Sequence, residues 1–177
     1  MRKSLWILTS LLILMTSVGL VGAWGTNQQV ACDFVTGGGF IVGAGGSSLA
    51  AGVHGNFGVG GGVKNGAFWG HLEYNDHGTT PPMQIHGTSV TGYFAVSPTE
   101  REIDGTCRIN GVDGFTYRVR VNDLGEPGIN RDQFSILINE TGYHAGFYFG
   151  DGPIRGGNIQ LHKGNASNTP PQGFTCQ

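Results

Sequence analysis

Charged residues are scarce in this chain of 177 residues. Asp, Glu, Lys and Arg together make up 12% of the sequence, about half the ~25% that is usual for soluble domains. The basic residues are also the minority, with 10 Lys and Arg against 12 Asp and Glu. A surface with so few positive charges does not attract nucleic acid or anionic lipid by bulk electrostatics. We therefore expect neither as a partner.

Helical periodicity and long apolar runs are missing beyond the first two dozen residues, which excludes a helical bundle. The one apolar run, residues 5–20, follows the basic Arg2 and Lys3 and precedes small residues that end at Ala23. This order is typical of a secretory signal peptide. The run of about 16 residues is shorter than the ~20 that span a membrane. We expect a signal peptide at 1–23, a mature chain that starts at Trp24, export to the extracellular space or cell surface, and no stable membrane anchor.

The chain has few cysteines, and their number is odd. Cys32, Cys107 and Cys176 are the three in the chain, so at most one intramolecular disulfide forms in an oxidising compartment. Cys107 shares a strand side with Ile103 and Ile109, which predicts a core position as a small apolar side chain. Three states remain open: a Cys32–Cys176 bridge that ties the ends of the domain together, a Cys32–Cys107 bridge, and no bridge. We expect the first.

Glycine, by contrast, is abundant, with 33 residues, and it alternates with apolar and aromatic residues in ordered segments. Phe115, Tyr117, Val119 and Val121 lie on one side of a segment with polar residues between them, the period of two that is typical of a half-buried strand. The same alternation recurs at Phe68, Leu72 and Tyr74, at Ile103, Cys107 and Ile109, at Phe134, Ile136 and Ile138, and at Ile159 and Leu161.

Hairpin-sized loops separate these segments at residues 64–66 and 110–114, each with an Asn-Gly pair. Strands joined in this way are antiparallel, because parallel strands need a long crossover. The apolar side switches between Ile85 and Val90, which predicts a β-bulge near Gly87 and Thr88.

These patterns predict an all-β fold. We expect an antiparallel meander of about 8–10 strands that forms a closed or partly closed barrel, with a β-sandwich as the alternative. A single β-domain spans 24–163, and a polar C-terminal tail without a strand pattern follows at 164–177.

Five segments, four of them with glycine, form an ordered set along the chain, at residues 36–41, 55–58, 122–128, 132–136 and 156–162. This set resembles the post-COAP family of secreted, mainly bacterial β-domains. The resemblance covers about 36–163, nearly the whole mature chain. It implies an extracellular β-fold and no particular activity.

The segment between two predicted strands, residues 122–132, is rich in side-chain oxygens. Asp123, Glu126, Asn130 and Asp132 lie within ten residues beside turn glycines, and calcium takes six to eight oxygen ligands on flexible loops. This predicts a candidate calcium site. The alternative is a purely structural turn in which Asp123 and Asp132 accept Asx-type hydrogen bonds.

Three histidines lie on or near one predicted hairpin. His71, His77 and His86 make a candidate zinc or copper site, although their spacing is not that of a compact metal motif. Trp69 has the opposite parity to Phe68 and Leu72, so we expect it to face outward, where an aromatic ring stacks on sugars. In residues 147–149 one aromatic parity also points outward.

Motifs of catalysis are missing from the chain: it has no nucleophile elbow, zinc-protease motif or phosphate-binding loop. Glu73 and Asp76 form an acidic pair of the kind that twelve acids produce by chance. We expect a non-catalytic, secreted or cell-surface β-module with a structural or interaction role and an extracellular protein or glycan as partner. A calcium- or carbohydrate-binding domain is the second hypothesis and a secreted hydrolase the third. Self-association through edge strands would favour a filament or matrix role.

Overall fold

A computed structural model describes residues 28–177, so the expected signal peptide at 1–23 and Trp24 lie outside the described residues. The strands are β1 (Gln28–Val30), β2 (Phe34–Val42), β3 (His54–Lys64), β4 (Ala67–Asp76), β5 (Met83–Ala95), β6 (Glu100–Ile109), β7 (Val112–Asn122), β8 (Gln133–Ile138), β9 (His144–Gly146), β10 (Gly156–His162) and β11 (Phe174–Cys176). A single turn of 3-10 helix, η1 (Phe147–Phe149), follows β9.

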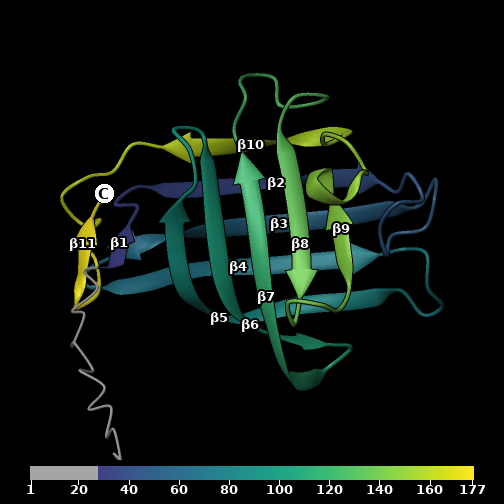
Figure 1. The fold of residues 1–177 in the computed structure, drawn as a ribbon, viewed down its shortest axis with the longest axis horizontal. Helices are drawn as coiled ribbons and strands as arrows, with labels where there is room; N and C mark the ends of the chain where they lie inside the picture. Colours follow the sequence, from purple (N-terminus) through teal and green to yellow (C-terminus); the bar gives the residue numbers. More distant parts are fainter. Residues whose placement is uncertain (1–27) are drawn as a thin grey trace, which may run out of the picture.

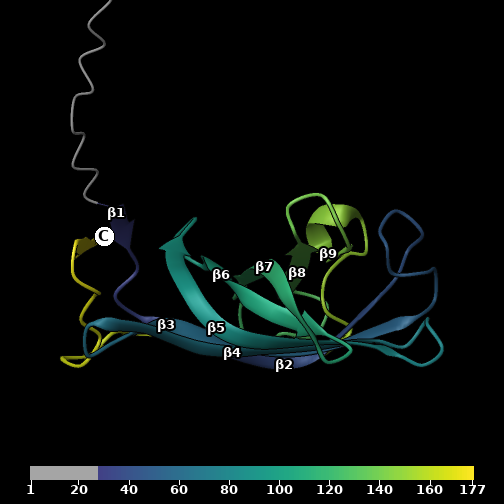
Figure 2. The ribbon, with the colours of Figure 1, turned by 90° about the horizontal axis from the view of Figure 1, so that it is seen from below.

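Nine strands form one antiparallel sheet in the order β10-β2-β3-β4-β5-β6-β7-β8-β9. Strands β2 to β9 pair in chain order, and β10 returns to the outer side of β2 (Figure 1). The sheet curls into a half-barrel, so that β10, β2, β3 and β4 form a back layer and β6, β7, β8 and β9 cross in front of it (Figures 1 and 2). The predicted all-β, partly closed barrel is confirmed.

Strand β5 joins the two layers and bends at two bulges. Its pairing with β4 ends at His86, and its pairing with β6 slips between Gly87 and Ser89, which leaves Thr88 as the extra residue. The bulge predicted near Gly87 and Thr88 is therefore confirmed. A second slip lies between Val90 and Gly92 and was not predicted. Bulges bend a strand and strengthen its twist, so β5 turns from one layer into the other here.

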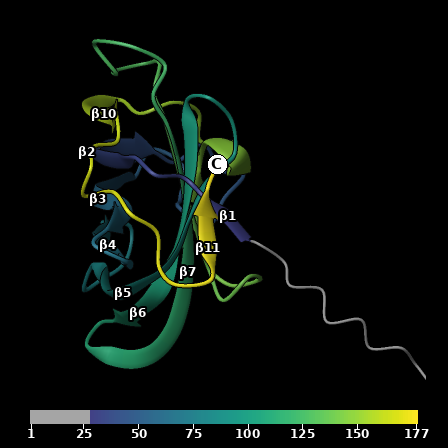
Figure 3. The same ribbon diagram turned by 90° about the vertical axis from the view of Figure 1, so that its left-hand side faces the viewer.

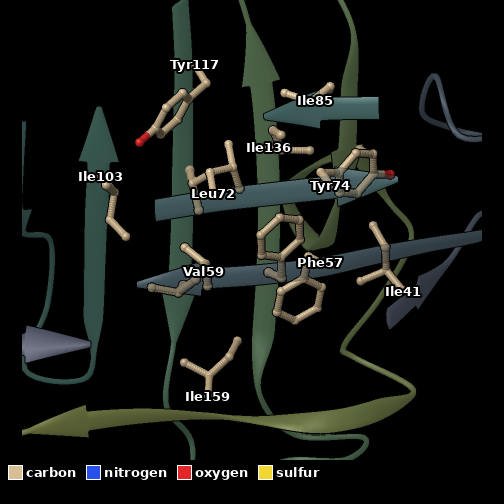
Figure 4. Packing of buried hydrophobic residues seen from close by; sticks show 14 of the residues in the cluster. Ile41, Phe57, Val59, Leu72, Tyr74, Ile85, Ile103, Tyr117, Ile136 and Ile159 are labelled. Atoms are coloured by element: carbon tan, nitrogen blue, oxygen red, sulfur yellow. The ribbon is translucent and has the colours of Figure 1, made fainter. Parts of the chain in front are cut away.

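The core fills the space between the inner faces of the two layers (Figure 4). Phe57 and Tyr74 of the back layer pack against Phe134 of the front layer, with Phe57 and Phe134 stacked at a centroid distance of 4.0 Å. The predicted inward residues of β6 to β8 are buried, including the thiol of Cys107, except that Ile109 and Phe115 are half-buried against the core. Strand alternation in the sequence therefore identified the inner faces correctly.

The β3–β4 and β6–β7 hairpins have two-residue Asn-Gly loops. Asn110 and Gly111 adopt φ values of 49° and 83°, which both central residues of a type I′ turn require. Asn65 and Gly66 do the same at 50° and 78°. The Asn110 side chain also accepts a hydrogen bond from the N–H of Gln84 at 2.8 Å, which ties the β6–β7 turn to β5.

The two ends of the described chain lie together (Figure 3). Strands β1 and β11 pair in parallel, and a disulfide joins Cys32 to Cys176 while Cys107 is free and buried. The expected disulfide is confirmed and the Cys32–Cys107 alternative is wrong. The sequence after Lys163 predicts no strand, but β11 lies there. This strand was missed because three residues are too few to show an alternation.

Candidate functional site

The outer face of the back layer is open. Apart from the C-terminal segment near the β3–β4 turn, no element of residues 28–177 lies outside it (Figures 2 and 3). Side chains at alternate positions of four strands point out from this face. One row across the strands consists of His162, Phe34, Gly62 and Trp69, because Phe34 pairs with both His162 and Gly62, and Gly62 pairs with Trp69.

Three of these residues form an aromatic cluster (Phe34, Trp69 and His162). The Phe34 and His162 rings stack at a centroid distance of 4.5 Å, and Phe34 lies 6.0 Å from Trp69 at an interplanar angle of 51°. Phe34 and Trp69 meet above Gly62, where an added Cβ would lie 2.7 Å from Phe34 Cβ and 3.0 Å from Trp69 Nε1. The Trp69 Nε1 is buried without a partner among the described residues, so the rest of the half-buried indole is the part that solvent reaches.

A bare glycine slot (Gly38 and Gly58) lies further along the same strands. The two glycines are direct cross-strand partners. A Cβ added at Gly58 would meet no atom within 4 Å, and one added at Gly38 would approach only backbone. The slot therefore exposes flat sheet backbone that no side chain covers.

A second aromatic pair lies beyond the slot, where Phe40 stacks on His54 at a centroid distance of 4.7 Å. Phe34 and Phe40 are six residues apart on β2, which corresponds to roughly 20 Å of extended strand. We call the aromatic cluster, the glycine slot and the Phe40–His54 pair together the outer strip.

The polar groups of the outer strip are mostly uncharged. Thr36 Oγ1 lies 2.9 Å from His162 Nε2, Asn158 and Gln160 flank it on β10, and the ring of His71 lies over Gly60. Hydroxyl and amide groups serve as both donors and acceptors. The strip thus offers neutral hydrogen-bonding groups beside apolar rings.

The expected metal-binding histidines do not lie together. His86 contacts Glu73, its cross-strand partner, and His71 faces outward from the same strand as Glu73. His77 lies in the turn after β4 and donates its backbone N–H to His54 O at 3.1 Å. Within residues 28–177 no three His, Cys, Asp or Glu side chains gather in a geometry that would hold a metal ion. The zinc or copper site remains a prediction.

The four expected calcium ligands line the free edge of β10. Asp132 is fully buried and accepts hydrogen bonds from Leu124 N at 2.9 Å and Ile159 N at 2.8 Å. Asp123 accepts from Gly125 N at 3.1 Å, an Asx-type bond, and from Leu161 N at 2.9 Å. These two carboxylates therefore satisfy N–H groups that an edge strand would leave unpaired.

The other two expected ligands bond to side chains. Glu126 Oε1 accepts from Asn158 Nδ2 at 2.8 Å, and Asn130 Oδ1 accepts from Arg155 Nη1 at 3.1 Å. The far edge of the sheet is also covered, since Ser48 N donates to His144 O of β9 at 2.8 Å. Self-association through edge strands remains a prediction. The calcium site remains a prediction.

No family model, curated protein or solved structure matches this chain. The resemblance to the post-COAP family therefore stays a prediction, and the functional proposal rests on the chain's own residues.

The remaining reactive groups are buried or set apart. Burial raises the pKa of the Cys107 thiol to about 11, which keeps it protonated and weakly nucleophilic at neutral pH. Asp76 is buried and accepts from Tyr143 Oη at 2.9 Å, whereas Glu73 is exposed on the same strand. The two acids therefore do not face each other as a catalytic pair.

Phe34 and His162 are residues of the outer strip that sequence reasoning missed. Their parity on β2 and β10 was readable, since Phe34, Thr36, Gly38 and Phe40 alternate. What could not be read was the register that brings them beside Trp69, because glycine-rich strands carry few side chains that fix a register.

Proposed function

We propose that this protein is a non-catalytic extracellular β-module that binds a neutral polysaccharide along its outer strip. The observation that carries the proposal is the bare Gly38–Gly58 slot between two groups of aromatic rings. A polymer chain lying along β2 would meet an aromatic ring at each end and open backbone between them.

The chemistry of the strip supports a sugar chain over other partners. A pyranose ring has apolar C–H faces that pack on aromatic rings and a rim of hydroxyl groups that bond to amides and hydroxyls. The outward positions of the four back-layer strands contain one acid, Glu73, and one base, Lys64. A face without net charge is matched by a neutral ligand. Its flatness and length of roughly 20 Å favour an extended β-1,4-linked chain over a coiled α-linked one.

An extracellular location is supported by the disulfide between Cys32 and Cys176, since such bridges persist in oxidising compartments. No helix within residues 28–177 has the length and apolar character needed to span a membrane.

Binding to insoluble polysaccharide tests the proposal. The mature protein is incubated with microcrystalline cellulose, chitin or granular starch, and the unbound protein is measured. We expect binding to cellulose or chitin that Trp69→Ala weakens at least tenfold, and little binding to starch. Val112→Ala is the matched control, because Val112 is exposed on a distant hairpin. Equal binding by the Trp69 and Val112 variants would refute a role for the outer strip.

A further inference from the structure

A groove crosses the outer face of the front layer, on the opposite side of the molecule from the outer strip. It consists of two adjoining hollows of about 250 and 310 Å³ that share Arg118 and Leu137 in their walls. The first hollow extends from Arg118 to Tyr148 and Phe149, and the second extends to Thr106 and Asn139. We call this the front groove.

An exposed but fixed aromatic side chain forms one end of the front groove. Tyr148 belongs to η1, which lies beside β8 at the end of β9 (Figure 1), and 48% of its surface is exposed. Its hydroxyl donates to Glu100 Oε1 at 2.7 Å, its backbone N–H donates to Ser135 Oγ at 3.0 Å, and the Arg120 guanidinium lies 5.5 Å from the ring centroid. A large exposed side chain held by two contacts, on a backbone fixed by a third, is preorganised for binding, because little side-chain entropy remains to be lost.

The two bases of the front groove, Arg118 and Arg120, are paired with acids. Arg118 Nε lies 3.0 Å from Asp104 Oδ1 and 3.2 Å from Glu102 Oε1. Arg120 Nε donates to Glu102 Oε2 at 2.8 Å. Glu100 at the Tyr148 hydroxyl and Glu140 in the wall of the second hollow add two further acids, so the acids of the front groove outnumber its bases and an anionic ligand is not favoured.

Hydroxyl-rich ligands match such pairs, because a hydroxyl group donates to the carboxylate and accepts from the guanidinium of the same pair. An aromatic ring at one end and a floor that includes Leu137 would pack on the apolar faces of sugars. The front groove therefore has the same ligand chemistry as the outer strip, built from different residues.

The back and front layers pack inner face to inner face, so their outer faces point in opposite directions (Figures 2 and 3). We propose that the front groove is a second binding site for a neutral polysaccharide and that the protein bridges two sugar chains. This inference rests on the proposed function of the outer strip.

Titration calorimetry with cellohexaose as the probe tests the inference. We expect the wild-type protein to bind two molecules of cellohexaose. Tyr148→Ala, which lacks the tyrosine ring of the front groove, and Trp69→Ala should each bind one. A second variant, Leu137→Trp, fills the junction of the two hollows and should also reduce binding to one. The melting temperatures of all variants establish whether each one folds. If one of the two front-groove variants does not fold, the other still tests the second site.

Cross-linking provides the second readout. Wild-type protein should raise the viscosity of a hydroxyethylcellulose solution severalfold, and either single-site variant should not. One bound cellohexaose in the wild type that only Trp69→Ala removes would overturn the second site and leave the proposed function intact. If the wild type binds one cellohexaose and only the front-groove variants abolish that binding, the outer strip is refuted as the binding site and bridging is overturned as well. No binding of cellohexaose by any protein, together with no binding of the wild type to cellulose or chitin, would overturn both proposals.

Discussion

Phe57 of β3 and Phe134 of β8 stack face to face at a centroid distance of 4.0 Å, although they belong to opposite layers of the half-barrel. Both are buried. Phe134→Ala should therefore destabilise the fold by about 3–5 kcal/mol, because it removes a ring from the junction of the layers and leaves a cavity. Urea unfolding of this variant measures the loss. Leu124→Ala, at an exposed loop position, is the control and should change stability by less than ~0.5 kcal/mol; similar losses in both variants would contradict the layered core.

The disulfide should contribute substantially to stability. Cys32 and Cys176 are separated by 144 residues, and closing a loop of that length stabilises by about 4–5 kcal/mol in the chain-entropy model. Replacing both with Ser, or reducing the protein, should lower the urea midpoint accordingly, and an unchanged midpoint would argue against the bridge.

Alkylation of the native, unreduced protein should leave Cys107 unlabelled, because it is buried with a pKa raised to about 11.

Gly58→Val separates stability from binding. The added side chain meets no neighbouring atom, and a β-branched residue in a strand is favoured over glycine by up to ~1 kcal/mol. The variant should melt at the same temperature as the wild type or higher. It should nevertheless lose binding at the outer strip, because valine fills the slot. Retained cellulose or chitin binding in a folded Gly58→Val protein would show that the slot is not used.

The Asp132 carboxylate should be more important for closing the barrel edge than for binding calcium. Asp132→Asn places an amide donor against Leu124 N or Ile159 N, and a buried unpaired group costs about 1–3 kcal/mol. We expect that loss in urea unfolding. We also expect no change in melting temperature when millimolar calcium is added to EDTA-treated wild-type protein. A calcium-dependent rise that Asp132→Asn removes would instead establish the calcium site, since a ligand that binds only the folded state stabilises it.

Alkaline pH should unfold the protein cooperatively. All five tyrosines of the chain have a pKa raised above the usual value, chiefly because burial disfavours the phenolate. In the unfolded chain they ionise near about pH 10, so the unfolded state releases protons first. Their contribution to stability is present below about pH 10 and is lost as pH rises beyond it. Tyrosinate absorbance should rise together with the loss of circular dichroism; a rise well before unfolding would contradict this.

Most of the fold could be predicted from strand alternation, because the side chains that face the core recur at every second residue of a strand. The phase change between Ile85 and Val90 was enough to predict one bulge. The second, between Val90 and Gly92, escaped because Gly92 has no side chain to mark a change of side. Tyr93 is consequently buried, which the sequence pattern did not indicate.

The candidate site was less predictable than the fold because it depends on pairings between distant segments. The outward position of Trp69 was readable from its strand, but its neighbours Phe34 and His162 come from strands paired through glycines. The role of Asp132 depends on Ile159 N, which lies 27 residues away. No local spacing could reveal that a carboxylate completes the edge of β10.

The joined ends have a mechanical consequence. Tension applied between residue 28 and residue 177 would enter the molecule beside Cys32 and leave it beside Cys176, so the covalent bridge would bear it. The nine-stranded sheet lies inside the loop that this bridge closes and would therefore carry no tension. A module of this design holds its shape, and any chain bound to it, while its attachment points are pulled apart.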